Sequence, residues 1–477
     1  MKRLIALTVV ILLVVVFGGG CGNGPGSPGW TGKIKGEPPP IDLEGEEILV
    51  VDHPDNHNRR WQRHETSNPY NDAWQRVLDN IEQKWNCKIK LNIVPLDSML
   101  TEALPEIMAG EKYCDIFCTT QWQFGHMLGA DLMRDLNELS TNWENPWWNP
   151  NIRRIGTING KTFAANGSFI FDAVDTWIIR FNFDVWNDLN LPDPYEMVEN
   201  GEWTMDRLMD YSKRAMRDND GNGIVDTPDD RWGIVAPDGD FARALYMSAG
   251  NQYFLEENGK MVMGCYDTRS LDFIARMRKF NREDKSVAPN FFRDMGEQRI
   301  PMQEQMFMDG RTLFYSCRLV ADRLRNMEAD WGVLPMPKYD EAQESYMNCV
   351  DHNATVMGIT KTHPNPESLG KLLDAIGFYA MELEKIYWPD YEETYWRHEE
   401  DTRIIADYVC HAGRYDMALL LQNVDPVFRT PMSLVFDAMF GGLSDISSAV
   451  EARKEAVDFA LDKYFADWQE EVNRENQ

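Results

Sequence analysis

The sequence predicts an α/β fold, because segments with the hydrophobic period of a strand alternate with segments that have the period of a helix. The chain has 477 residues, which is enough for two domains or more. Hydrophobic residues make up 43% of it and aromatic residues 12%, so sizeable buried cores can form. We therefore expect a globular protein in which helices pack on the faces of parallel sheets.

The alternation begins near Glu46, where the folded part of the chain starts. The stretch "EEILVVDH" (46–53) is apolar and β-branched, as in a buried strand. "KIKLNIVP" (88–95) alternates between apolar and polar residues, which also predicts a strand. Between the two strands, apolar residues recur at helical spacing, at Trp74, Val77, Leu78, Ile81 and Trp85.

A second helical run extends from Leu96 to Met108, and Pro105 inside it predicts a kink or break in its C-terminal half. "YCDIFCTT" (113–120) follows as a third strand, with two cysteines that lack the second Cys/His pair of a metal site. We expect these cysteines, Cys114 and Cys118, to be buried thiols. The order strand, helix, strand, helix, strand predicts a parallel sheet.

Residues at the carboxyl ends of these strands are the first candidates for ligand contact, because ligands of open α/β sheets bind there. Those after the first strand are Asp52, His53 and Asp55. Those after the third strand are Thr119, Thr120 and Trp122. Loop residues that only cap helices would show the same pattern, so the sequence leaves both interpretations open.

Residues 1–20 predict a signal peptide. A short basic start is followed by an almost wholly apolar run from Leu4 to Phe17, which is too short to span a bilayer comfortably. The small residues before Cys21 resemble a bacterial lipobox, so we expect Cys21 to be lipidated, with ordinary secretion as the alternative. Residues 21–44 then form a Gly/Pro-rich tether that cannot pack a core.

The formal net charge of −29 argues against nucleic acid, anionic membrane surfaces and polyanionic ligands as partners. Lys and Arg are scattered along the chain and form no basic patch in the sequence. From about Ser368 the pattern is mostly helical, and Val450 to Trp468 predicts a long acidic end helix.

The stretch "RDNDGNGIVDTPDDRWG" (217–233) has the spacing of a twelve-residue calcium loop. Gly223 stands at its sixth position, where such loops turn sharply. The expected ligands are the side chains of Asp218, Asp220, Asn222, Asp226 and Asp229 and the backbone carbonyl of Ile224. Asp230 is an alternative to Asp229 as the last ligand, and a solvated acidic turn is the alternative to an ion site.

The flanks of this loop predict a structural role for the ion. A helix with its N-cap at Thr204 and an apolar stripe from Met205 to Met216 enters the loop, and "RWGIVAP" (231–237) leaves it as a strand. Calcium sensors change the angle between two helices, usually in paired loops, and this chain has neither a second helix here nor a second loop of this spacing. We therefore expect calcium to tie a helix to a strand.

Three further stretches identify the family that the chain resembles: "NFDVWNDLNLPDPYEMVENGEWTMDRLMDYSKRAMRDNDGNGIVD" (182–226), "WGVLPMPKYDEAQESYMN" (331–348) and "GRYDMAL" (413–419). They resemble the extracellular solute-binding proteins of family 1, the sugar-binding lipoproteins of ABC importers, and the first stretch is the most specific. The chain departs from the family pattern at Thr227 to Arg231, which stand between the loop and the following Trp-Gly.

The resemblance implies a two-lobed fold of the type II periplasmic-binding-protein class, in which a ligand between the lobes closes a hinge. The expected N-terminal lobe comprises residues 45–165 and 352–412. The expected C-terminal lobe comprises residues 166–351 and 413–477 and carries the calcium loop. The protein would act as a monomer at the outer face of the cell membrane, held there by its lipid alone, and would deliver a sugar to an ABC permease.

Carbohydrate is favoured as the ligand because the chain has sixteen tryptophans, whose faces stack on sugar rings. Position relative to strands and crossings selects Asp55, Trp122, Asn166, Ser168, Ser316, Arg318, Asp351, His352 and Asn353 as ligand-binding candidates. Further possible stacking platforms, which could equally be packing residues, are Trp147, Trp148 and Trp177.

Two other classes of function remain as alternatives. A secreted glycan-active enzyme would need a pair of flanking carboxylates, and no stretch isolates one. No Gly-x-Ser-x-Gly, His-Glu-x-x-His or phosphate-loop motif occurs either. A surface module for adhesion or polysaccharide retention would share the leader and the aromatic content but lack a transporter partner.

Overall fold

The computed structural model describes residues 36–54, 69–170, 172–319, 322–443 and 445–475. The predicted signal peptide, Cys21 and Asp55 lie outside these residues. Within them, no helix combines the length and apolar character that crossing a membrane requires.

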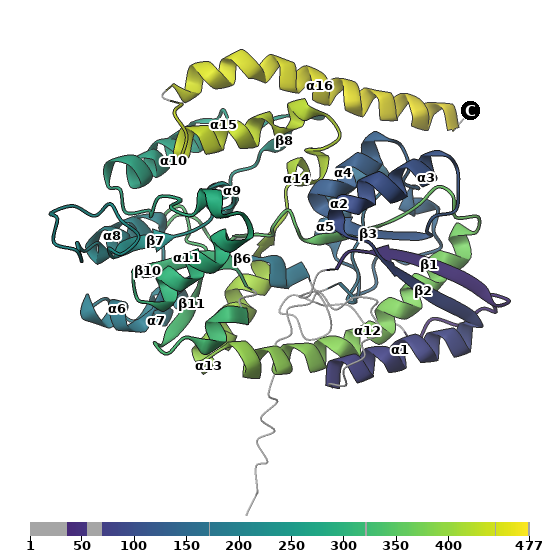
Figure 1. Ribbon diagram of the computed structural model, residues 1–477. Helices are drawn as coiled ribbons and strands as arrows, with labels where there is room; N and C mark the ends of the chain where they lie inside the picture. The colour runs from purple at the N-terminus through teal and green to yellow at the C-terminus, as the bar shows by residue number, and fades with distance from the viewer. Residues whose placement is uncertain (1–35, 55–68, 171, 320–321, 444, 476–477) are drawn as a thin grey trace, which may run out of the picture.

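Two four-stranded sheets stand side by side and define the two lobes of the molecule (Figure 1). The first sheet has the order β13-β3-β1-β2, in which β1 runs parallel to both β2 and β3 and β13 is antiparallel to β3. Its strands are β1 (Glu46–Asp52), β2 (Cys87–Ile93), β3 (Ile116–Thr120) and β13 (Thr355–Ile359). The three strands predicted from the sequence are thus confirmed, together with their parallel order.

The helices of the first lobe also follow the predicted pattern. The apolar stripe from Trp74 to Trp85 lies on α1 (Pro69–Trp85), which packs against α12 (Pro366–Tyr395). The run from Leu96 to Met108 is interrupted by a π-helical turn before Pro105, rather than after it. The other helices here are α2 (Leu96–Ser98), α3 (Leu104–Met108), α4 (Gln121–Gly129) and α5 (Pro150–Ile155), beside the short hairpin of β4 (Thr157–Ile158) and β5 (Lys161–Thr162).

The second sheet has the order β11-β6-β10-β7 and is mixed, because β6 is antiparallel to both of its neighbours. Its strands are β6 (Trp177–Asn182), β7 (Trp232–Val235), β10 (Thr312–Arg318) and β11 (Trp331–Pro335). The helices of this lobe are α6 (Phe183–Asp188), α7 (Pro194–Glu199), α8 (Met205–Ala215), α9 (Asp238–Ser248), α10 (Thr268–Arg278), α11 (Arg299–Met308) and α15 (Thr430–Met439), with a hairpin of β8 (Phe254–Glu257) and β9 (Lys260–Met263).

Three of the chain segments that cross between the lobes lie against one another, and we call them the first, second and third crossings. The first crossing ends at Thr176, which pairs with Val350 of the second crossing. The second and third crossings pair through two short parallel strands, β12 (Asn348–Cys349) and β14 (Gly413–Arg414). These pairings place residues 350–355 between the two sheets.

The packing differs from the predicted boundary at residue 412. After α12 the chain already reaches the second lobe, because α13 (Glu399–Ile404) packs on β11 and α7. It then returns, and α14 (Met417–Leu421) packs on α4 of the first lobe. The first crossing is also later than residue 165, since Asn166 and Ser168 still bond to first-lobe carbonyl groups.

The long end helix predicted from the sequence is α16 (Ile446–Glu475), which runs along one side of the molecule over both lobes (Figure 1). It packs on β9 and α15, and the carboxylate of Asp458 accepts the backbone N–H of Met263 at 2.8 Å. Near its other end, the Nδ2 group of Asn159 in the first lobe donates to the carbonyl of Phe465.

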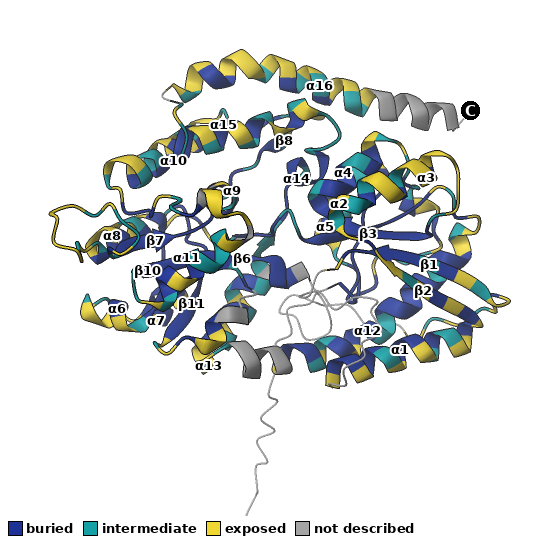
Figure 2. Cartoon of the chain, in the orientation of Figure 1, coloured by how far each residue is buried: buried dark blue, intermediate teal, exposed yellow. Residues whose placement is uncertain are grey.

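The central strands of both sheets are buried, and exposed residues gather on the outer faces of the helices (Figure 2). Every residue of β3, β6, β11 and β13 is buried, including the polar Arg180 and Asn182 of β6. Cys114 and Cys118 are fully buried, as predicted.

A buried carboxylate holds α13 on the second lobe. Asp401 accepts the hydroxyl of Tyr195 and the backbone N–H of Val333, both at 2.8 Å. Burial raises the pKa of Asp401 to about 6, although these two donors favour its ionised form.

We predict that Asp401→Asn flattens part of the pH dependence of stability. The folded state keeps the Asp401 proton up to about pH 6, whereas the unfolded chain releases it near pH 4, so the free energy of unfolding falls as pH rises through this window. The variant keeps an acceptor for both donors and should be more stable than the wild type by about 2–3 kcal/mol at pH 8 but not at pH 4.5. Urea unfolding at the two pH values measures the difference, and an equal effect of the substitution at both would contradict it.

Candidate functional site

The crossing turn, residues 350–355, is tied to both other crossings. The N–H of Val350 donates to the carbonyl of Arg414 at 3.0 Å, and the N–H of Asp351 donates to that of Asp175 at 2.9 Å. Thr355 then begins β13 of the first sheet. Residues on this turn therefore stand where the lobes meet.

Helix α4 of the first lobe begins on the crossing turn. Its preceding residue, Thr120, makes no side-chain cap. Instead, the N–H groups of Gln121 and Trp122 donate to the carbonyls of Ala354 and His352, at 3.0 and 3.3 Å. The turn thus satisfies two of the N–H groups that a helix start leaves without partners, and it fixes where Trp122 lies.

The side chain of Asp351 is buried in the turn, with 1% of its surface exposed. Its Oδ2 accepts the indole N–H of Trp177 at 2.7 Å, and its Oδ1 accepts both N–H groups of Asn353, at 2.9 Å from the backbone and 2.8 Å from the amide. Burial by itself would raise the pKa of Asp351, but His352, Arg243 and Arg318 hold it well below its usual range. Asp351 is therefore a fixed negative charge.

Trp122 and Asn353 are half-buried and directly bonded. The indole N–H of Trp122 donates to the Oδ1 of Asn353 at 3.1 Å. Because Asn353 is itself held by Asp351, the indole ring has a defined orientation. Three predicted ligand-binding residues therefore form one continuous set of hydrogen bonds.

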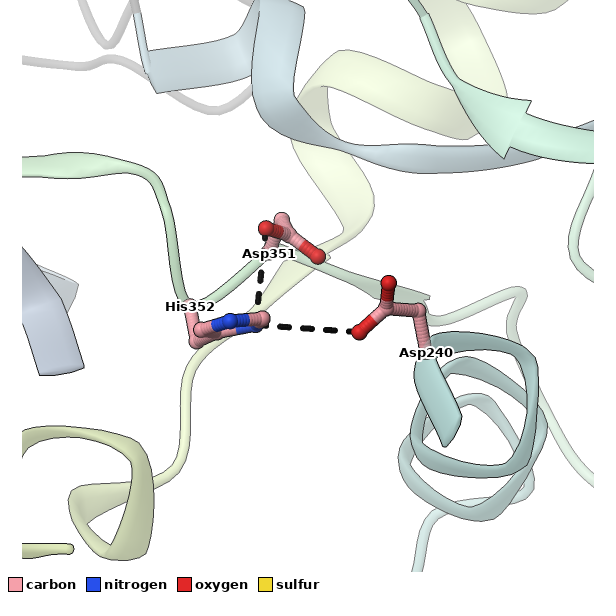
Figure 3. A group of neighbouring side chains, drawn as sticks. All are labelled: Asp240, Asp351 and His352. Carbon is pink, nitrogen blue, oxygen red and sulfur yellow. Dashed lines mark ion pairs between the residues drawn. The ribbon is translucent and has the colours of Figure 1, made fainter. Parts of the chain in front are cut away.

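A group of charged side chains lies on the second-lobe side of the turn (Figure 3). Asp240 and Arg243 come from the start of α9, and His352 comes from the turn itself. The Nδ1 of His352 lies 3.5 Å from Asp351 and 3.9 Å from Asp240, the two contacts drawn as dashed lines in Figure 3. The guanidinium of Arg243 donates to Asp240 at 2.5 Å and also bonds to the Nδ1 of His352.

Arg318 is the remaining predicted residue that is open to solvent here, with 32% of its side chain exposed. It ends β10, and its Nη1 donates to the buried carboxylate of Asp175 at 2.6 Å. Trp122, Arg318, His352 and Asn353 thus offer partly exposed side chains around the crossing turn, with Asp351 beneath them.

The other predicted residues are internal. Asn166 donates to the carbonyl of Thr355 at 2.7 Å, Ser168 to that of Gly377 at 2.8 Å and Ser316 to that of Ile178 at 3.3 Å, and all three are buried. Their positions fix the chain around the site and leave little surface for a ligand. Of the other strand-end candidates, the four that the structure describes are buried: Asp52, His53, Thr119 and Thr120.

The three further tryptophans are packing residues in this structure. Trp147 and Trp148 are 2% and 4% exposed, and both indole N–H groups donate to the Oδ1 of Asp374 on α12, at 3.0 and 2.8 Å. Trp177 is 3% exposed, and its indole N–H donates to the Oδ2 of Asp351. Their faces are not available as stacking platforms here, which agrees with the packing alternative.

Sequence reasoning missed three members of the site, Asp175, Asp240 and Arg243. They carry no motif, and Arg243 lies more than one hundred positions before Asp351. Asp240 and Arg243 lie in the first turns of α9, directly after the predicted strand at 231–237. Ligands of α/β sheets bind at the carboxyl ends of strands, so the reasoning that selected candidates in the first lobe would also have indicated these two.

The predicted calcium loop joins α8 to β7, as the flanking pattern indicated. Thr204 stands at the N-cap of α8 but makes no side-chain cap. Arg217 and Arg231 exchange two backbone hydrogen bonds of 2.9 Å and close the loop. Gly221 and Gly223 have φ values of 77° and 93°, which side chains rarely adopt, so the glycines are needed at the turn.

Three carboxylates in the loop converge, those of Asp218, Asp220 and Asp230, with ligand atoms that all lie within 4.8 Å of one another. Asp230 is buried and accepts the backbone N–H groups of Asn219 and Thr227, which lower its pKa. The pKa of Asp218 is also lowered, by the N–H of Gly223 and that of Gly221.

Of the two alternatives for the last ligand, Asp230 and not Asp229 lies with this cluster. Asp229 is 81% exposed, and its Oδ1 accepts Arg311 at 3.1 Å on the neighbouring chain segment. The inward-facing carboxylate is therefore one position later than the twelve-residue spacing predicts. The side chain of Ile224, the expected carbonyl ligand, points to solvent with 57% exposure.

A separate pocket of about 700 Å³ lies beneath α16, between the first-lobe residues 154–160 and the β8–β9 hairpin. Its lining includes Arg154, Phe254, Met417 and Phe465, and none of the predicted ligand-binding residues.

Comparison with protein families decides the class of the chain. Residues 67–378 match the model of the bacterial extracellular solute-binding proteins, and this range is well over half of the chain. The protein belongs to that family. Among curated protein sequences, none matches this solute-binding protein at a significant level.

Solved structures show that this solute-binding protein has the two-lobed type II fold. A binding protein for cyclic α-maltosyl-1,6-maltose from Arthrobacter globiformis is 13% identical, with a TM-score of 0.58 over 87% of this chain and 98% of that one. An ABC substrate-binding protein from Listeria monocytogenes in complex with cycloalternan is 13% identical, with a TM-score of 0.56 over 87% and 99%. A maltose-binding periplasmic protein from the same organism, in complex with maltose, is 13% identical, with a TM-score of 0.56 over 88% of this chain and 99% of that one.

We predict that Asp374→Ala destabilises the solute-binding protein by about 3 kcal/mol, because it leaves two buried indole N–H groups and the backbone N–H of Asn142 without their acceptor. Urea unfolding measures the loss. Asp206→Ala is the control, since the Asp206 side chain is 77% exposed in its pair with Arg276 and should contribute less than about 1 kcal/mol. Equal effects of the two substitutions would show that Asp374 does not anchor Trp147 and Trp148.

Proposed function

We propose that this protein captures a sugar or oligosaccharide beside the crossing turn, between its two lobes, and delivers it to a membrane ABC permease. The observation that carries the proposal is the half-buried indole of Trp122, held by Asn353 next to partly exposed polar side chains where the lobes meet. Family membership supports capture of a solute. The sugars named for the structurally similar proteins support the ligand class.

The chemistry of these side chains suits a carbohydrate. An aromatic face receives the C–H patches of a sugar ring, and charged or amide groups bond to adjacent hydroxyls. Trp122 would supply the face, and Arg318, His352 and Asn353 would supply donors and acceptors. Each arginine here is already paired with a carboxylate, Arg318 with Asp175 and Arg243 with Asp240 and Asp351, which favours an uncharged ligand over an anionic one.

The same carboxylates argue against a glycosidase. A glycosidase needs one carboxyl group that keeps a proton for the leaving group. Asp351 is buried and its pKa is held low, and Asp175 is buried in its pair with Arg318. Asp240, the third carboxylate here, is bonded to Arg243 at 2.5 Å. Because each of the three is already paired with an arginine, we propose binding without catalysis.

We further propose that lipid on Cys21 anchors the protein at the outer face of the cell membrane, that residues 21–44 tether the lobes to it, and that the protein acts as a monomer. The signal-like leader supports this anchoring. Such a tether leaves the lobes free to meet a permease in the same membrane. An adhesion module would bind glycan without any dependence on a permease.

We predict that maltose or maltotetraose raises the melting temperature of the protein and remains chemically intact. A ligand that binds only the folded state stabilises it by about 2.7 kcal/mol at one hundred times its Kd. A thermal-shift series with these sugars, followed by a reducing-end assay, measures both effects. New reducing ends would contradict the non-enzymatic proposal. If no neutral sugar in a wider panel raised the melting temperature, that result would contradict the ligand class.

Trp122→Ala should weaken sugar binding by at least about tenfold, because it removes the stacking face. Phe459→Ala is the matched control, since this aromatic ring on α16 is 69% exposed and far from the crossing turn in sequence. Similar losses for the two variants would remove Trp122 from the site.

We also propose that the loop at 218–230 binds calcium and uses it to hold α8 to β7. Two of its converging carboxylates are kept ionised by backbone donors, and oxygen ligands of this kind are those that calcium prefers. Asp218, Asp220 and Asp230 would be side-chain ligands. Asn222, Asp226 and the carbonyl of Ile224 remain in the proposed set by their spacing.

We predict that calcium raises the melting temperature of the wild type and that Asp220→Asn abolishes this rise. Asp220 is exposed and accepts the backbone and amide N–H groups of Asn222, and asparagine keeps an oxygen acceptor there, so the substitution should not destabilise the calcium-free protein. Asp229→Asn is the adjacent control and should keep the rise, because Asp229 pairs with Arg311. Thermal melts in EGTA and in calcium give both values, and loss of the rise in Asp229→Asn alone would return Asp229 to the ligand set.

A further inference from the structure

We propose that Arg243 is a positioning residue of the binding site: from the second lobe it holds the crossing turn, and through that turn it sets the orientation of the Trp122 ring. This proposal rests on the proposed function for its consequence, a weaker sugar complex. The positioning itself is a property of the ligand-free protein and can be measured without a sugar.

Arg243 contacts two carboxylates and the imidazole of His352 with one nitrogen. Its Nη2 lies 2.5 Å from Asp240 and 3.4 Å from the Oδ2 of Asp351, and it bonds to the Nδ1 of His352. The side chain is 11% exposed, so these contacts are shielded from water. Shielded contacts between opposite charges are stronger than those at the surface.

The charge balance makes Arg243 necessary to the turn. Asp351 is a buried negative charge, and a buried charge persists only where it is paired and hydrogen-bonded. Burial opposes the charge on Arg243, but Asp240 and Asp351 raise its pKa above its ordinary value. His352 and Arg318 also act on Asp351, but the Nδ1 of His352 is itself bonded to Arg243, and Arg318 is bonded to Asp175 at 2.6 Å.

The same geometry explains why this cluster is not a metal site. Asp240, Asp351 and His352 offer ligand atoms within 4.8 Å of one another, which is a spacing that a metal ion could use. The Nη2 of Arg243 bonds to or pairs with each of the three. The guanidinium therefore takes the place of the cation and links α9 to the turn.

A continuous path of contacts leads from Arg243 to the indole. Asp351 receives Arg243 on its Oδ2 and both N–H groups of Asn353 on its Oδ1. Asn353 in turn accepts the indole N–H of Trp122. Without Arg243, the Asp351 carboxylate would lose a compensating charge and would move toward solvent. Asn353 would then lose the acceptor that holds it in place. The Trp122 ring would then lose its single orientation.

The test is fluorine NMR on ligand-free protein labelled with 5-fluorotryptophan, in which Trp122→Phe identifies the Trp122 resonance among those of the sixteen tryptophans. Arg243→Met should shift or broaden the Trp122 resonance. Arg243→Lys should leave the Trp122 resonance close to its wild-type position, because a single nitrogen of Arg243 makes all the contacts and lysine also carries one nitrogen. Asp240→Ala removes a partly exposed carboxylate that pairs with Arg243 and lies 3.9 Å from the Nδ1 of His352, and it should move the resonance in the same direction by less.

Arg276→Met is the matched control. Arg276 lies on α10 in the same lobe and pairs with Asp206 at 2.5 Å, so its loss removes one arginine without touching the turn. It should leave the Trp122 resonance in place. If Arg243→Met is too unstable to label, Asp240→Ala and Arg243→Lys carry the comparison.

Titration with maltotetraose then measures the affinity of each variant for the sugar. We expect Arg243→Met to bind about tenfold more weakly than the wild type and Arg243→Lys to bind nearly as well. An unchanged Trp122 resonance in Arg243→Met, or in Asp240→Ala if only that variant folds, overturns the positioning role. A resonance that moves supports it even if the wild type does not bind maltotetraose. That last result would count against the proposed ligand class alone.

Discussion

The buried carboxylate of Asp351 sits where the chain crosses between the lobes, and the arrangement of the site depends on keeping it ionised there. A charge with 1% exposure needs partners that cannot move away. Trp177 supplies an N–H from the second sheet, Asn353 supplies two from the turn, and Arg243 supplies a cation from α9. The hydrogen bonds that keep Asp351 ionised thus fix the crossing turn, and the turn fixes the positions of the site side chains around it.

Both lobes are built onto this turn by backbone as well as side-chain contacts. In the first lobe, α4 starts on its carbonyl groups and β13 continues from it into the sheet. In the second lobe, β6 begins directly after the crossing that bonds to Asp351. A hinge motion between the lobes must therefore bend the chain close to the residues that would touch a ligand, so that ligand contact and lobe closure are mechanically connected.

Much of this organisation could be predicted from local patterns. The first three strands and the helix–loop–strand unit around residues 205–235 follow from hydrophobic period and loop spacing, which are local properties. Asp240 and Arg243 could not be found that way, because only the folded chain brings α9 to the turn. The boundary at residue 412 differed for a similar reason: the contact of Asp401 with Tyr195 holds α13 on the second lobe, and the sequence pattern of a helix does not show which lobe it joins. Likewise, Trp147 and Trp148 are buried with their indole N–H groups bonded to Asp374, a partner more than two hundred positions away.

The central claim is that the ligand binds at the crossing turn between the lobes. A crystal structure of the complete protein with a neutral oligosaccharide that raises its melting temperature tests this most directly. The account predicts a sugar ring stacked on Trp122, with hydroxyl groups bonded to Arg318, His352 or Asn353 and with Arg243 still bound to Asp351. A sugar bound instead in the pocket beneath α16, lined by Arg154 and Phe254, would contradict it.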